Sequence, residues 1–186
     1  MLTLAEAAKD DGIKAVALGN FGTLAQTRGD LAEAEGYYAQ ALTLNQELGR
    51  KKGMANQYGN LGTLAQTRGD LAAAEGYYEQ SLTLNQELGR KEGMAADYGN
   101  LGILAKIRGD LAAAEGYYAQ SLTLEKELGL KEGMANQYGN LGGLEHARGN
   151  MAGARAFWVQ ARDLYAEIGM PHRVEQAQGL LDDLED

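Results

Sequence analysis

An asparagine recurs every forty residues along this 186-residue chain. The side-chain amide of asparagine carries two hydrogen-bond donors and an acceptor, so it can pair with the backbone of an extended peptide of almost any sequence. A ladder of such amides would bind a polypeptide without covalent chemistry. The alternative is structural, because most side-chain hydrogen bonds serve local structure and each asparagine could tie one helix to the next. The ladder consists of Asn20, Asn60, Asn100 and Asn140.

Residues arranged for catalysis or metal binding do not stand out. His146 and His172 are the only histidines, the chain has no cysteine, and neither histidine has carboxylates at a metal-ligand spacing. The sequence has no glycine-rich phosphate loop ending in Lys-Ser or Lys-Thr. It also shows no nucleophile–base pair and no paired carboxylates. We therefore expect a protein that is not an enzyme and that uses no cofactor or metal.

Charge and composition narrow the class of partner. A net charge of −9 argues against nucleic acid, because binding to phosphates needs a basic face. No stretch approaches the roughly 18 apolar residues of a membrane span, and the sequence shows no signal-peptide pattern. The absence of cysteine fits a reducing compartment. These features favour a cytoplasmic protein with a protein or peptide partner and no affinity for membranes.

The structural elements that would position this asparagine ladder belong to one sequence unit, which occurs four times in the chain. Residues 51–90 and 91–130 differ at only ten positions, and similar strings begin at Leu18 and Tyr138. A fixed period of this length is typical of a solenoid, whose stacked repeats bury what a single repeat cannot. The expected organisation is a partial helix over 1–10, four repeats (11–50, 51–90, 91–130 and 131–170) and a capping helix over 171–186. The opening partial helix suggests a piece of a longer array.

Each repeat reads as two helices, which we call helix A and helix B. In the second repeat Tyr58 and Leu61 lie on one face of helix A, and Gly69 can take the left-handed conformation that ends a helix. Asp70 then caps helix B, which buries Tyr78. We expect Gly62 to be small because the two helices cross closely there. The same turn explains the Arg-Gly-Asp strings as a helix-ending cation, a terminator and a cap, in preference to an integrin ligand.

These residues resemble the signature of the tetratricopeptide repeat (TPR) family. In the second repeat the matching positions are Tyr58, Leu61, Gly62, Ala65, Gly69, Ala74, Tyr78 and Ser81. The closing proline of the family is absent, and the period exceeds the common 34 residues. The long repeat with Asn-Leu-Gly in helix A is similar to those of the Pins and LGN spindle adaptors and of kinesin light chains. The resemblance implies an all-α fold, a right-handed solenoid of antiparallel helix pairs, that serves as a protein-binding scaffold.

The resemblance also implies that a polar stripe on helix A faces a concave groove. Five of the ten differences between repeats two and three fall near this stripe, where Ile103 and Ile107 replace threonines. Isoleucines inside a polar rim indicate either an anchor pocket for a ligand or extra packing between repeats. We expect the groove to bind an extended or helical peptide. The predicted groove residues are Asn20, Thr23, Asn56, Asn60, Thr63, Thr67, Asn100, Ile103, Lys106, Ile107 and Asn140.

Two other functions remain open at this point. Near-identical repeats stack on one another, so separate chains could self-assemble, or the chain could act as a spacer or sensor within a larger protein. Met1, Leu2 and Leu4 would form only the last turns of a helix B. We therefore expect the outward face of the first repeat to be poorly covered around Leu18, Phe21 and Tyr38, and to mediate weak self-association.

Overall fold

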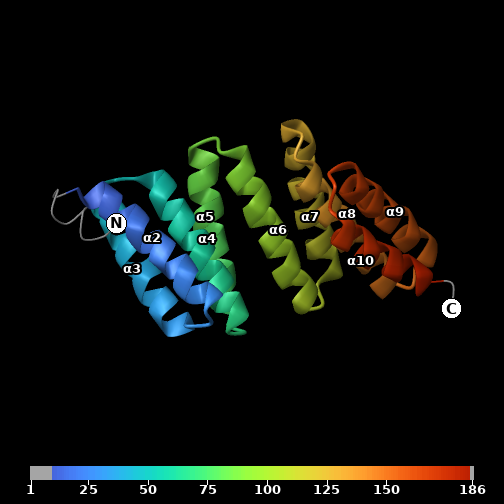
Figure 1. Ribbon diagram of the computed structural model, residues 1–186, viewed down its shortest axis with the longest axis horizontal. Helices are drawn as coiled ribbons and strands as arrows, with labels where there is room; N and C mark the ends of the chain where they lie inside the picture. Colours follow the sequence, from blue (N-terminus) through green and yellow to red (C-terminus); the bar gives the residue numbers. More distant parts are fainter. Residues whose placement is uncertain (1–9, 185–186) are drawn as a thin grey trace. The chain divides into compact units, whose positions relative to one another are not determined.

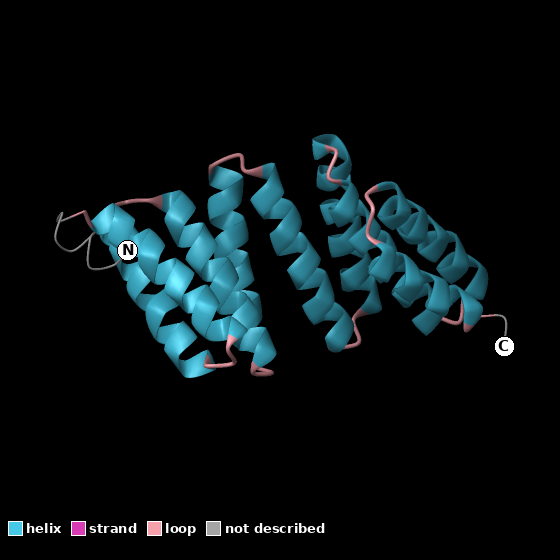
Figure 2. Cartoon of the chain, viewed as in Figure 1, coloured by secondary structure: helices cyan, strands magenta, loops and turns pink. Residues whose placement is uncertain are grey.

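The computed structural model describes residues 10–184, and this part of the chain contains nine α-helices and no strand (Figure 1). Short loops join consecutive helices (Figure 2). The helices are α2 (Asp11–Thr27), α3 (Leu31–Glu47), α4 (Lys51–Thr67), α5 (Leu71–Glu87), α6 (Lys91–Ile107), α7 (Leu111–Leu128), α8 (Lys131–Ala147), α9 (Met151–Glu167) and α10 (Pro171–Asp182). The even-numbered helices are helix A of each repeat and the odd-numbered ones helix B. The predicted all-α solenoid of helix pairs is confirmed. The partial helix expected from Met1, Leu2 and Leu4 lies outside the described residues.

The chain divides into two compact units, Met1–Gly93 and Met94–Asp186. The first contains α2 to α5, and the second contains most of α6 together with α7 to α10. In the described residues, no helix combines the length and the apolar character needed to cross a membrane.

Turn chemistry ends and restarts the helices as the sequence predicts. Gly69 has a φ of 80°, a conformation that glycine adopts without strain. The side chain of Asp70 then accepts a hydrogen bond of 3.0 Å from the backbone N–H of Ala73, which caps α5. Asn150 caps α9 in the same way. Asp30 occupies the equivalent position before α3 but makes no such side-chain hydrogen bond.

A buried aromatic ring holds each helix pair together. A Cβ atom on Gly62 would lie 2.6 Å from Cε1 of Tyr78, so the close approach that we predicted is that of the Tyr78 ring to α4. In the fourth repeat the indole of Trp158 lies against Gly142 in the same manner. Any larger residue at these glycines would displace the ring, because protein cores leave little free volume.

The expectation of a poorly covered first repeat is wrong for Leu18 and Tyr38, which are 2% and 1% exposed. The Tyr38 ring lies against Gly22 of its own repeat, so it is covered without a preceding repeat. The exposed apolar side chains of α2 are instead Ile13, Val16 and Leu24.

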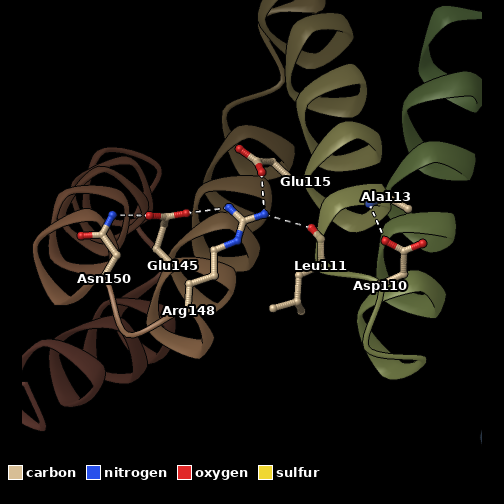
Figure 3. Close-up of polar contacts among 7 residues, drawn as sticks. All are labelled: Asp110, Leu111, Ala113, Glu115, Glu145, Arg148 and Asn150. Carbon is tan, nitrogen blue, oxygen red and sulfur yellow. Dashed lines mark hydrogen bonds and ion pairs between the residues drawn. The ribbon is translucent and has the colours of Figure 1, made fainter.

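The arginine of the turn joins one repeat to the preceding one. In the second unit Arg148 forms ion pairs with Glu115 of α7 at 2.7 Å and with Glu145 of its own helix at 2.9 Å (Figure 3). It also donates a hydrogen bond to the carbonyl oxygen of Leu111. Arg68 makes the corresponding contacts with α3 in the first unit. The arginine therefore links repeats, a role beyond the interaction with the helix end that the sequence suggested.

Candidate functional site

An open cavity of about 540 Å³ lies in the second unit and carries part of the predicted stripe. Its wall comes from α6 and α8, which are the A helices of repeats three and four, and from the C-terminal helix α10, with contributions from α7 and α9. The lining residues are Ala96, Gly99, Asn100, Ile103, Glu125, Asn136, Gln137, Gly139, Asn140, Trp158, Ala161, Tyr165, Arg173, Gln176, Ala177 and Leu180. A cavity of this size can hold several side chains of a bound peptide.

Three predicted groove residues meet in this cavity: Asn100, Ile103 and Asn140. The amide nitrogen of Asn140 donates to Oε1 of Gln137 in its own helix at 3.2 Å. Asn100 makes no side-chain hydrogen bond within the described part of the chain. Both asparagines are half-buried, so their amides can still meet a ligand. The expected alternative, in which Asn140 ties neighbouring helices together, does not describe this bond, which stays within α8.

Lys106 and Ile107 do not line the cavity. Both are exposed, and 55% of the Ile107 surface is open to solvent. Ile103 is half-buried and packs against the core as well as lining the cavity. The structure therefore separates the two isoleucines that the sequence treated as one apolar patch.

The remaining predicted groove residues lie in the first unit. They are Asn20 on α2, half-buried Asn60 on α4, and the exposed residues Thr23, Asn56, Thr63 and Thr67. Asn60 donates weakly to Gln57 at 3.5 Å, as Asn140 does to Gln137. Asn56 is already engaged, because its Oδ1 accepts from Nη1 of Arg90 at 3.2 Å.

Two of the stripe positions contact the buried tyrosine. The single proton of the Tyr78 hydroxyl is shared between two acceptors, Oε1 of Gln66 at 3.0 Å and Oγ1 of Thr63 at 3.3 Å. Thr23 and Gln26 contact Tyr38 in the same way. The interpretation that these positions face only a ligand is therefore incomplete, since they also satisfy a core hydroxyl.

The third repeat has lost these acceptors. Ile103 and Lys106 replace the threonine and the glutamine, and the buried hydroxyl of Tyr118 has no hydrogen-bond partner among the described residues. Burial raises the pKa of Tyr118 to about 12. The differences between repeats two and three thus change the core as well as the groove wall.

Several residues that shape the cavity were not predicted from the sequence. The hydroxyl of Tyr165 donates to Oδ1 of Asn136 at 2.6 Å. The indole N–H of Trp158 donates to the carbonyl oxygen of Gly139 at 3.2 Å. These contacts join α9 to α8 beneath the groove. The fourth repeat differs from the other repeats at the positions of Tyr165 and Trp158. This difference was the sequence signal that could have identified both residues.

Arg173 of α10 is a cation at the cavity wall. Its guanidinium lies 5.9 Å from the centre of the Tyr165 ring and donates to Oε1 of Gln176 at 3.3 Å. Tyr165 has a raised pKa, chiefly because of its burial, which the positive charge of Arg173 partly offsets and Glu132 reinforces.

Glu125 is the acidic group of the cavity and is only 5% exposed. Burial raises the pKa of this carboxyl, and hydrogen bonds from Gln137 and Ser121 partly counteract that effect. Glu125 could have been identified from the sequence, because it is one of the ten differences between repeats two and three. The second repeat has Asn85 at the equivalent position.

The cavity groups are suited to binding. They offer amides, an acid, a guanidinium and aromatic rings, a combination that can orient a peptide by hydrogen bonds and apolar contacts. Among residues 10–184 there is no cluster of three or more side chains that could hold a metal ion.

Comparisons with known proteins agree with this architecture. Two tetratricopeptide-repeat profiles match the chain, one over residues 53–127 and the other over residues 15–48. No match was found among curated protein sequences.

Several solved structures are similar to the chain at low sequence identity. BtubC (BKLC) from P. vanneervenii is 22% identical with a TM-score of 0.75, over 98% of this chain and 84% of that one. Aspartyl phosphate phosphatase F from Bacillus subtilis is 12% identical with a TM-score of 0.87; the match covers 92% of this chain but only 45% of the phosphatase. The nearly identical TPR-like repeats assigned to a kinesin light chain of Podospora anserina are 16% identical with a TM-score of 0.69, over 92% and 93% of the two chains. At these identities the likeness shows the fold alone.

The repeat period, the helix pairs with a ring packed on a glycine, and the matching profiles all agree. Tetratricopeptide repeats are generally protein–protein interaction modules. The chain belongs to the tetratricopeptide-repeat family.

Proposed function

We propose that the protein is a non-enzymatic scaffold that binds an extended or helical peptide in the groove formed by its A helices. The observation that carries the proposal is the cavity in the second unit, which brings together Asn100, Ile103 and Asn140. The asparagines would hold the backbone of the peptide, and Ile103 would contact an apolar side chain. A cytoplasmic location would suit such a scaffold.

The first unit contributes the same stripe in a more polar form. Asn20, Asn60 and the threonines lie on the A helices α2 and α4, where they offer hydrogen-bond partners to a peptide backbone. The threonine hydroxyls are partly used by their own helices, since Thr63 donates to the carbonyl oxygen of Gly59 at 3.1 Å. The main contribution of this unit would therefore come from the asparagines.

A blocked groove tests the proposal directly. Gly139 lines the cavity, and a Cβ atom there would meet nothing within 4 Å, so Gly139→Phe should fill the cavity without disturbing the helix. Gly116→Phe is the matched control, because Gly116 is an exposed helical glycine on α7 with equally open surroundings outside the cavity.

Peptides selected from a random library on the unmodified protein should bind Gly116→Phe normally and Gly139→Phe weakly, as measured by fluorescence anisotropy. The double variant Asn100→Ala/Asn140→Ala should also bind them more weakly, by about 0.5–1.5 kcal/mol for each hydrogen bond removed. Equal affinity for the two phenylalanine variants would show that peptides bind elsewhere.

A second candidate function is self-association through the first repeat. The exposed side chains of Ile13 (49%), Val16 (53%) and Leu24 (45%) give α2 an apolar surface. Sedimentation velocity over a concentration series, with Val16→Asp as the comparison, would reveal it. A monomer at every concentration would exclude this function.

A further inference from the structure

Repeats two and three differ most informatively at the end of helix B. In the second repeat the guanidinium of Arg90 lies at this point and donates from Nη1 to Oδ1 of Asn85 at 2.9 Å. The same nitrogen donates to Oδ1 of Asn56 at 3.2 Å. In the first unit, the guanidinium of Arg90 therefore binds the side-chain oxygens of two asparagines.

In the third repeat all three of these residues are different. Leu130 stands in place of the arginine, Ala96 in place of the helix A asparagine and Glu125 in place of the helix B asparagine. The replacements remove the internal cation, shorten one of its partners and convert the other into an acid. Ala96 and Glu125 both line the cavity of the second unit.

The surroundings of Glu125 leave half of its carboxylate unused. Oε1 accepts from Nε2 of Gln137 at 3.3 Å and from Oγ of Ser121 at 3.3 Å. Oε2 is buried and has no hydrogen-bond partner among the described residues. Glu125 also lies in the last turn of α7, where the helix dipole disfavours negative charge. An acid in such a place is costly unless a cation pairs with it.

Nearby cations of the second unit are directed elsewhere. Nζ of Lys126 lies 5.4 Å from the centre of the Tyr138 ring. Arg173, at the cavity wall, contacts Tyr165 and Gln176. Glu125 thus lines the open cavity, and no cation among the described residues pairs with its Oε2.

We propose that the cavity of the second unit takes the cationic side chain of an arginine or lysine in the bound peptide, which pairs with the carboxylate of Glu125. The inference rests on the proposed peptide-binding function and names the chemistry of one peptide position. Asn136 and Asn140 border the same cavity and can hold the peptide backbone beside that side chain.

Trp158 is the only tryptophan and lines the cavity, so its fluorescence reports occupancy. Butylguanidinium and butylammonium are suitable probes, and neutral butanol is the control. We expect saturable changes with the cations and none with butanol, and the two cations distinguish arginine from lysine as the source. Glu125→Gln should weaken cation binding about tenfold or more, the loss expected for a charge-assisted hydrogen bond. Glu125→Asn restores the residue of the first two repeats and should weaken it similarly.

Cation binding should also depend on pH in a defined direction. The bound form needs the ionised carboxylate, so affinity should rise as pH rises through the pKa of Glu125. Cation binding should in turn lower that pKa, which carboxyl carbon NMR can follow. Of the other cavity-lining groups, Tyr165 from α9 has a pKa raised above its ordinary value, chiefly by burial, and Arg173 from α10 is a cation. Gly116→Phe should retain cation binding, because Gly116 lies outside the cavity.

The outcomes separate this inference from the peptide-binding proposal. If butanol binds as well as the cations, or if Glu125→Gln retains their affinity while its circular dichroism is unchanged, the cation site is wrong. If selected peptides bind but tolerate replacement of every arginine and lysine by norleucine, the inference fails and the peptide groove remains. If the cations bind at Glu125 but no peptide binds the protein, the cation site is supported and the peptide groove is wrong.

Discussion

Replacing Tyr118 by phenylalanine should leave the protein as stable as before or stabilise it, whereas replacing Tyr78 should destabilise it. The two residues occupy equivalent places in consecutive repeats, and each side chain is fully buried. They differ in the hydroxyl: that of Tyr78 donates to Thr63 and Gln66, and that of Tyr118 has no partner among the described residues. The same deletion of one oxygen therefore has opposite consequences.

The magnitudes follow from the cost of burying a polar group. Tyr78→Phe loses a hydrogen bond worth about 0.5–1.5 kcal/mol, and water can reach the partly exposed acceptors that it leaves. Tyr118→Phe removes an unsatisfied hydroxyl whose burial costs about 1–3 kcal/mol. A change of 1 kcal/mol shifts the melting temperature of a chain this long by about 2–4 °C. The two variants should therefore melt several degrees apart, with Tyr118→Phe the higher.

Thermal unfolding followed by circular dichroism gives the comparison. Hydrogen exchange in α5 and α7 then assigns it locally, because repeat arrays can open one repeat at a time. A reciprocal variant, Ile103→Thr/Lys106→Gln, rebuilds the acceptors of Tyr118 and should stabilise the protein only while Tyr118 is present. Equal destabilisation by the two phenylalanine variants would refute the reasoning, since it would mean that the Tyr118 hydroxyl has a partner of its own.

The unpaired hydroxyl also has a consequence at high pH. Burial holds the pKa of Tyr118 at about 12 in the folded protein, above the ordinary value of 10.0. Ionisation of Tyr118 therefore leaves the stability of the folded protein unchanged below pH 10. Stability falls as the pH rises from 10 through about 12, because the tyrosine ionises first in the unfolded chain. Tyr118→Phe should remove this part of the alkaline destabilisation in unfolding measured against pH.

Three further sets of substitutions test the packing of the repeats by the same thermal assay. Asp70→Ala should destabilise the protein by about 1 kcal/mol through loss of the cap of α5, whereas Asp70→Asn should be nearly neutral; equal large losses would mean that the charge has another role. Gly62→Ala should destabilise by about 1–3 kcal/mol because its Cβ would strike Tyr78, and Gly76→Ala, with open space around it, should stabilise by about 0.5–1 kcal/mol. Arg148→Met should cost about 1 kcal/mol or less, and the loss should shrink at high salt; a loss independent of salt would contradict the ion-pair role.

The sequence predicts the fold well because single residues specify the turns of each repeat. Gly69 and Asp70 specify a helix end and a helix start by local rules, and these rules operate without knowledge of the tertiary structure. The periodicity then assigns the buried faces. Leu18 and Tyr38 were misjudged because their burial depends on which neighbour covers them, and the sequence pattern does not say that Tyr38 closes on Gly22 of its own repeat.

The candidate site was predictable only in part. Helical spacing places Asn100 and Asn140 on a common face, and the structure brings both to one cavity. Ile103 and Ile107 share that spacing, yet only Ile103 reaches the cavity, because the second isoleucine lies at the exposed end of α6. The contribution of Glu125 comes from helix B and depends on how neighbouring helices pack, which periodicity within one helix cannot reveal.

The differences between nearly identical repeats carry more functional information than the residues they share. Shared residues such as Tyr78 and Gly62 are explained by packing alone. In the third repeat, by contrast, two groups of substitutions each leave a buried oxygen without a partner, on Tyr118 and on Glu125. Each unsatisfied group costs about 1–3 kcal/mol, a large share of the 5–15 kcal/mol by which folded proteins are stable. The cost at Tyr118 arises with the substitution that places Ile103 on the cavity wall. The cost at Glu125 arises with the substitution that places an acid there. Only the cost at Glu125 arises at the cavity itself, and there the cationic side chain of a bound peptide would offset it.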